Sequence, residues 1–85
     1  MARSQPDSVA VHTLTATIHH RPGALDRLVG LLRRQGCTVT AMTFVPSRVP
    51  ELAEVTVTFQ GGHAERVAQQ AQRLVDVVEV GAFIR

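Results

Sequence analysis

The sequence predicts an α+β fold in which two helices cover one face of a four-stranded antiparallel sheet. Four segments alternate apolar with polar residues, which is typical of half-buried strands. In two other segments apolar residues recur every third or fourth position, as they do on one face of a helix. The order of the segments is strand, helix, strand, strand, helix, strand. At 85 residues the chain fits one domain.

Residues 11–19 are predicted to form the first strand, because apolar residues alternate there with threonine. The first helix is predicted from Pro22 or Gly23 to Gln35. Its apolar stripe comprises Leu25, Leu28, Val29 and Leu32. Pro22 suits a first turn, where its missing N–H costs nothing, and Gly36 suits the left-handed position after the last turn.

The next two strands, residues 38–45 and 52–60, are predicted to form a hairpin around the loop 46–50, which begins and ends with proline. In the first of them the apolar positions shift phase by one residue, which indicates a β-bulge near Thr40 or Ala41. In the second, the apolar positions alternate with polar ones through Phe59, which is therefore expected on the buried face.

Gly61-Gly62 ends this pattern, and a second helix is predicted at residues 63–75 with Arg73 in its last turn. Its expected apolar face comprises Ala64, Val67, Ala71, Leu74 and Val75. The last strand is predicted at residues 77–84, and its expected apolar face comprises Val78, Val80, Ala82 and Ile84. Residues 1–8 are polar and are expected to form a flexible tail before a single domain at residues 9–85.

This order of elements is that of the ferredoxin-like arrangement. Right-handed crossovers then place the fourth strand beside the first, the first beside the third and the third beside the second, so residues 38–45 form an edge. That edge has no lysine and no interior proline to prevent pairing. We therefore expect a homodimer in which this edge strand pairs with that of a second copy.

The composition limits the expected partners and location. Nine arginines and seven acidic residues give a net charge of +2, and because the arginines are scattered we expect no nucleic-acid partner. The first strand also has no aromatic residue on which a base could stack. The first residues lack the apolar core of a signal peptide, and no apolar run would span a membrane. A cytoplasmic location is therefore predicted.

No residue pattern predicts catalysis or metal binding. The acidic residues are spread along the chain rather than paired. The single cysteine, Cys37, follows the helix-closing glycine, where nothing lowers a thiol pKa, so a buried and inert side chain is expected. His19 and His20 are adjacent, and on a strand they point to opposite faces and cannot chelate one ion together. We expect a chain that is not an enzyme and has no metal or cofactor of its own.

The junction of the first strand and the first helix, residues 19–28, is the candidate binding site. Backbone N–H groups at a helix start have no intrahelical partner and carry partial positive charge. A glycine there lets a ligand approach the backbone. The Pro22-Gly23 turn could therefore cradle the carboxylate of a small molecule, or it could do no more than start the helix.

Three segments of the chain carry a family resemblance. Residues 21–32 are similar to a helix start of the form Pro-Gly-x-Leu-x-Arg-x-x-Gly-Leu, residues 34–39 lead into the second strand, and residues 74–80 are similar to Lys-Leu-Val-Asp-Val-x-x-Val. In this order, these segments resemble the ACT domain of the regulatory small subunits of acetolactate synthase (acetohydroxyacid synthase). The resemblance spans roughly residues 11–81.

The resemblance implies a regulatory subunit that dimerises through its edge strand, residues 38–45. Such subunits bind and activate a catalytic large subunit, which uses thiamine diphosphate, Mg²⁺ and FAD in branched-chain amino-acid biosynthesis. Many confer feedback inhibition by valine, leucine or isoleucine, with the effector between the first turn of one protomer and the edge strand of the other. The alternative is a free-standing ACT-type amino-acid sensor or dimerisation module for a different enzyme.

The resemblance assigns the effector site to His20, Arg21, Pro22, Gly23, Ala24, Leu25, Thr38 and Val39. Two of these residues, His20 and Thr38, stand where the family pattern has asparagine. An asparagine amide both donates and accepts hydrogen bonds, and histidine and threonine do so with a different reach. The sequence therefore leaves open which effector binds, a branched-chain amino acid or another molecule.

Overall fold

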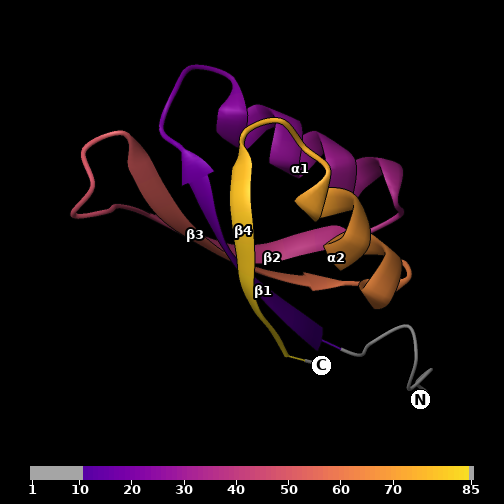
Figure 1. The fold of residues 1–85 in the computed structure, drawn as a ribbon. Coiled ribbons are helices and arrows are strands. Elements are labelled where there is room, and N and C mark those ends of the chain that lie inside the picture. Colours follow the sequence, from indigo (N-terminus) through magenta and orange to yellow (C-terminus); the bar gives the residue numbers. More distant parts are fainter. Residues whose placement is uncertain (1–10, 85) are drawn as a thin grey trace, which may run out of the picture.

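Four antiparallel strands form one sheet in the order β2-β3-β1-β4 (Figure 1). The computed structural model describes residues 11–84, so the tail predicted for residues 1–8 lies outside the described part of the chain. The strands are β1 (Val11–His19), β2 (Thr38–Pro46), β3 (Leu52–Gln60) and β4 (Val77–Ile84), and the helices are α1 (Ala24–Arg34) and α2 (Ala64–Gln72). The predicted ferredoxin-like fold is confirmed, with β2 at one edge.

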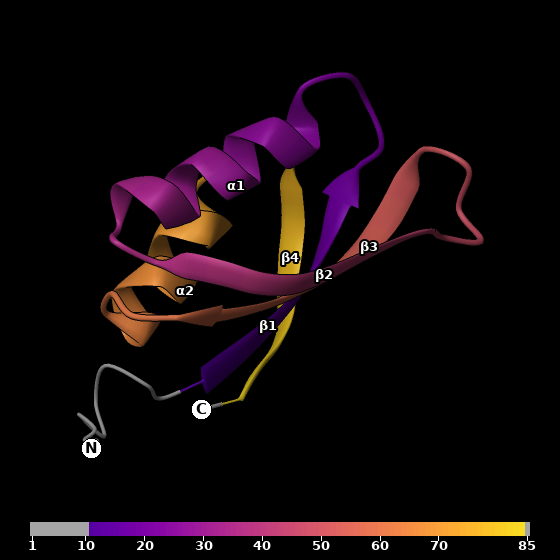
Figure 2. The ribbon, with the colours of Figure 1, turned by 180° about the vertical axis from the view of Figure 1, so that it is seen from behind.

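Both helices lie on the same face of the sheet (Figure 2). The largest fully buried side chains come from two strands and both helices: Phe59, Leu14, Ile18, Leu28, Leu32, Val55, Val57 and Val67. The alternation along β1 and β3 therefore sets the inner face, as predicted for Phe59. Threonines of the same strands lie half-buried on the face that no helix covers.

The predicted bulge is confirmed in β2. Val39 pairs with Phe59 and Ala41 pairs with Thr58, so Thr40 is the extra residue between them. The Thr40 hydroxyl donates a hydrogen bond to the carbonyl oxygen of Thr58 at 3.2 Å. An extra residue in one strand changes which side chains face the core, and this explains the phase shift in the sequence.

Helix α2 is shorter than predicted, ending at Gln72 instead of Val75. The N–H of Arg73 bonds to the carbonyl of Gln70, and that of Leu74 to Ala71, so the chain tightens into three-residue turns there. Arg73 is consequently the C-cap and not a residue of the last turn. Val75 was wrongly placed on the apolar face, because this turn leaves it 77% exposed.

The predicted apolar face of β4 is wrong at Val78. The pairing of β4 with β1 shifts register between Thr15 and Ala16 and again between Thr17 and Ile18. As a result Val77 and Val80 pack against the core, while Val78 is 49% exposed. The side chains of residues 82–84 are outside the described part of the structure.

The two outer ends of the described chain lie at the same end of the sheet. Thr13, near the start of β1, pairs with Ile84 at the end of β4. Ile18, near the end of β1, pairs with Val77 at the start of β4. The β1–α1 turn therefore lies at the opposite end of the sheet from both (Figure 1). Within residues 11–84, neither helix is long and apolar enough to cross a membrane.

Candidate functional site

A pocket of about 380 Å³ opens at the β1–α1 turn. It brings together six of the eight residues assigned to the site: His20, Arg21, Pro22, Gly23, Ala24 and Leu25. His19, Asp26 and Phe44 complete the lining. Thr38 and Val39 do not line it, because they begin β2, whereas Phe44 lies near its end. A contribution of Thr38 and Val39 from a second protomer stays a prediction.

The backbone of the turn is set by Gly23, which is the N-cap of α1 and has a left-handed φ of 84°. The N–H of Ala24 bonds back to the carbonyl of Arg21 at 3.2 Å, and the N–H of Arg27 bonds to the carbonyl of Gly23 at 3.0 Å. No side chain caps the helix, so its first N–H groups are not taken up by a side-chain acceptor. A ligand carboxylate fits this end of the helix on the same grounds.

We predict that Gly23→Ala destabilises the protein, while Gly30→Ala in the middle of the same helix stabilises it. A Cβ on Gly23 would lie 2.9 Å from Nη1 of Arg27, and its φ of 84° disfavours any L side chain, so we expect a loss of about 1–2 kcal/mol. A Cβ on Gly30 would meet only the flexible end of Arg34, at 3.4 Å. There alanine should gain up to about 1 kcal/mol through helix propensity. Urea unfolding measures both, and equal signs would contradict the assignment.

Phe44 is a pocket residue that the sequence did not reveal. Its ring meets the His20 ring edge-on, with centroids 5.1 Å apart and planes at 76°. The antiparallel register could have indicated it, because Phe44 pairs with Val55, and Val55 pairs with Ala16 near the end of β1. The pocket therefore has an apolar wall beside the polar turn, which suits a small carboxylate with an apolar side chain.

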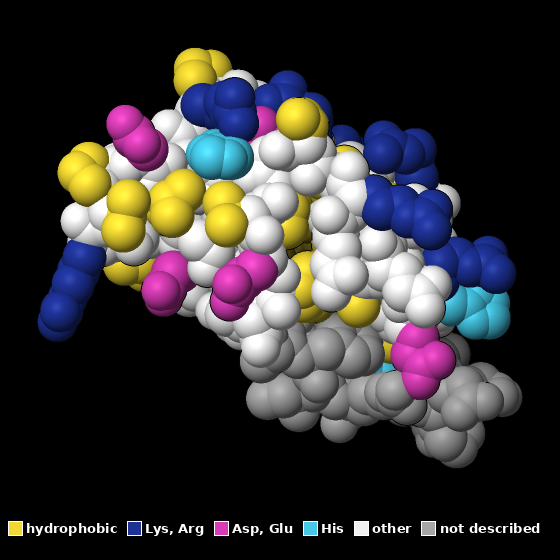
Figure 3. Space-filling view, viewed as in Figure 1, with side chains coloured by type: hydrophobic (Ala, Val, Ile, Leu, Met, Phe, Trp, Pro, Cys, Tyr) yellow, Lys and Arg dark blue, Asp and Glu magenta, His cyan; other side chains and the backbone are white. Residues whose placement is uncertain are grey.

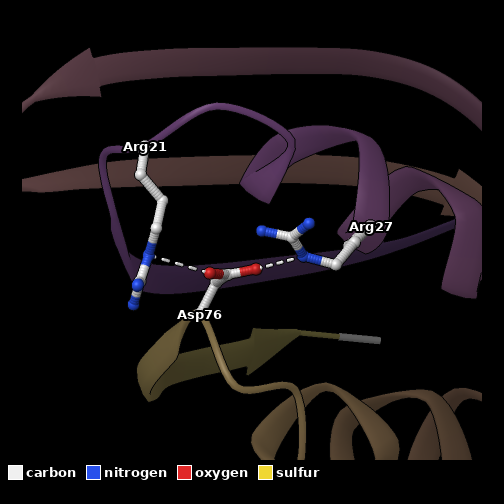
Figure 4. Close-up of polar contacts among 3 residues, drawn as sticks. All are labelled: Arg21, Arg27 and Asp76. Carbon is white, nitrogen blue, oxygen red and sulfur yellow. Dashed lines mark hydrogen bonds and ion pairs between the residues drawn. The ribbon is translucent and has the colours of Figure 1, made fainter.

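Asp76, just before β4, is the second residue that the sequence gave no role. Its carboxylate receives Nε of Arg21 at 3.0 Å and Nε of Arg27 at 2.5 Å (Figure 4). The Asp76 side chain is 3% exposed, whereas those of Arg21 and Arg27 are 50% and 48% exposed. Its backbone carbonyl accepts the N–H of His19 at 2.7 Å. One residue thus joins the end of β1, the turn and α1.

The two arginines keep Asp76 ionised. The hydrogen bond from Arg27 lowers the pKa of the Asp76 carboxyl; burial opposes this, and the charges of Arg27, Arg21 and His19 add to the lowering. The same hydrogen bond raises the pKa of Arg27. A buried carboxylate needs such partners, because an unpaired charge would be strongly unfavourable inside a protein. With two cations and one anion, the cluster gives this end of the molecule a net positive charge.

Cys37 lies apart from the pocket, at the start of the segment that leads into β2. It is buried, as predicted, and burial raises the pKa of its thiol. Its Sγ donates a weak hydrogen bond to the carbonyl of Gly61 at 3.5 Å. A raised pKa keeps the thiol protonated and poorly nucleophilic. Across residues 11–84, no three His, Cys, Asp or Glu side chains gather in a way that could hold a metal ion.

The fold and the pocket together define a ferredoxin-like domain whose first turn encloses a small-molecule-sized cavity. Residues 14–79 match the family described as the AHAS small subunit-like ACT domain. The chain belongs to this family, and the resemblance drawn from its three sequence segments is confirmed.

Relatives and solved structures agree with this assignment. The chain is 32% identical over 82 residues to the probable acetolactate synthase small subunit of Methanothermobacter thermautotrophicus, covering 94% of this chain and 47% of that protein. It is 30% identical over 69 residues to the acetolactate synthase isozyme 3 small subunit of Escherichia coli, covering 79% of this chain and 42% of that protein.

The crystal structure of the acetolactate synthase small subunit from Thermotoga maritima superposes with a TM-score of 0.75 at 27% identity, covering 86% of this chain and 47% of that one. The chain therefore spans about half the length of the relatives that it matches.

Proposed function

We propose that this chain is a non-catalytic regulatory subunit that binds and activates the thiamine-diphosphate-dependent large subunit of acetolactate synthase. The observation that carries the proposal is the family match over residues 14–79, together with relatives that are named as small subunits of that enzyme. The chemistry would belong to the large subunit, and this chain would act on it by binding.

The pocket at the β1–α1 turn is proposed to bind an amino-acid effector. The helix start and Arg21 suit a carboxylate, while Leu25 and Phe44 suit an apolar side chain. A branched-chain amino acid combines these two groups. Since His20 stands where the family pattern has asparagine, the preferred amino acid is left to experiment.

A homodimer through β2 is the proposed form of the subunit. Within the chain β2 pairs only with β3, so its outer edge offers backbone N–H and C=O groups to another strand. The single proline of β2, Pro46, is its last residue and leaves most of this edge able to pair. In such a dimer the partner's β2 would bring Thr38 and Val39 toward the pocket.

We predict that adding this chain to the purified cognate large subunit raises the rate of acetolactate formation. Acetolactate is measured at fixed large-subunit concentration while this chain is titrated, so saturation of the gain gives the affinity. The matched control is an equal amount of the Phe59→Ala chain, whose core is disrupted. Absence of any gain with the folded chain would contradict the proposal.

Calorimetric titration with the twenty amino acids separates this proposal from a free-standing sensor for another enzyme. Binding of valine, leucine or isoleucine together with activation of acetolactate synthase supports the regulatory subunit. Tight binding of a different amino acid without activation favours the sensor. The two results require the same protein preparation and differ in one assay.

A further inference from the structure

The cluster formed by Asp76, Arg21 and Arg27 touches the pocket without being part of its lining. Arg21 lines the pocket, and the guanidinium of Arg27 lies against Gly23, where a Cβ would come within 2.9 Å of it. Asp76 does not line the pocket, yet both arginines share its carboxylate (Figure 4).

We propose that Asp76 is a positioning residue, which holds Arg21 and the Gly23 turn in the arrangement that receives the carboxylate of an amino acid. The inference rests on the proposed function, in which an amino acid binds in this pocket.

The order in this cluster comes from Asp76. Its carboxylate is 3% exposed, and its backbone is tied to His19 by a 2.7 Å hydrogen bond, so it has little freedom. The two arginine side chains are about half exposed, and a long side chain in that setting samples many rotamers unless a partner holds it. The ion pair uses Nε of Arg21, and Figure 4 shows its terminal nitrogens pointing away from the carboxylate. They remain available to a ligand anion.

Removing the charge of Asp76 separates three explanations, because each predicts a different result. If only net charge mattered, Asp76→Asn would make the pocket more positive and would tighten the binding of a carboxylate. If Asp76 only stabilised the fold, the folded variant would bind with unchanged affinity. If Asp76 positions the site, binding weakens, because the released arginine must be ordered when the ligand arrives.

The experiment is calorimetric titration of L-valine, L-leucine and L-isoleucine into the full chain and three variants: Asp76→Asn, Arg27→Gln and Glu54→Gln. Glu54 is an exposed acid on β3, so its variant makes the same change of charge away from the cluster. We expect the two cluster variants to bind about tenfold more weakly, the size of one hydrogen bond to a charged group, and Glu54→Gln to bind as the unaltered chain does. Urea unfolding measures the folded fraction of each. Should Asp76→Asn not fold, Arg27→Gln tests the same contact from a half-exposed side chain.

Equal or tighter binding by the folded cluster variants would overturn the positioning role and leave the proposed function standing. If the unaltered chain binds none of the three amino acids, the effector proposal fails, and the positioning role is decided by NMR relaxation instead. A drop in the order parameters of the Arg21 Nε–H and the Gly23 amide in Asp76→Asn supports it. Unchanged order parameters overturn it.

Discussion

Gly62→Ala is expected to unfold much of the protein, lowering the free energy of unfolding by about 3 kcal/mol or more. A Cβ on Gly62 would lie 2.7 Å from the carbonyl oxygen of Gln35 and 2.7 Å from Sγ of Cys37. The φ of 72° also disfavours any L side chain. Because one of the atoms that it would meet belongs to the backbone, the segment after α1 would have to move away from the segment before α2.

The control for this prediction is Gly36→Ala. Gly36 has a similar φ of 81°, but a Cβ there would have no neighbour within 4 Å. It should cost only the left-handed conformation, about 1 kcal/mol. Chemical unfolding of both variants measures the difference, which reports the close approach of the two segments alone. Equal losses would show that the backbone contact contributes nothing.

Phe59→Ala should have an effect of the same order, with a loss of about 3–5 kcal/mol. Its side chain is fully buried on β3, between the sheet and the helices, and truncation would leave a cavity. An 85-residue domain has a total stability of only about 4–13 kcal/mol, so a large unfolded fraction is expected.

Phe44→Ala is the matched control, because Phe44 lies at the pocket on the edge strand and is only partly buried. It should cost clearly less stability than Phe59→Ala and should change ligand binding instead. Thermal unfolding and amino-acid titration of the two variants test this division of roles. A larger loss of stability for Phe44→Ala would contradict the placement of the core.

The strands in the middle of the sheet could be predicted to the residue. β1 and β3 each pair on both sides and bury one face, so apolar alternation, as at Val55 and Val57, marks their whole length. The errors lie where local hydrogen bonds or bulges decide the direction of a side chain. Val75 follows a tightened helix end, and Val78 lies between two register shifts, and neither feature leaves a mark in apolar periodicity.

The candidate site divides in the same way. The residues from His20 to Leu25 could be predicted because they form one continuous turn, which the Pro-Gly pair already marks. Phe44 and Asp76 come from distant parts of the chain, and only the folded sheet brings them to that turn. Asp76 stands within a recognised motif, but its burial and its two arginine partners depend on tertiary contacts.

The charged side chains of the described residues are unevenly distributed over the surface (Figure 3). Four arginines, Arg33, Arg34, Arg66 and Arg73, lie exposed on or next to the helices, while Glu54 and Glu79 are exposed on the strands. The pocket turn carries further positive charge from Arg21 and Arg27. Exposed charges of this kind act mainly on association rates and their salt dependence.

The pairing of Thr13 with Ile84 has a practical consequence for protein engineering. Because β1 begins where β4 finishes, a short peptide could join these ends and new termini could be opened in the β2–β3 hairpin loop, giving a circular permutant. For the same reason, a fluorophore or an immobilisation tag attached beyond either of these residues would start from the side of the sheet remote from the pocket. Ligand binding and subunit association could then be followed in one labelled molecule without obstruction of the turn.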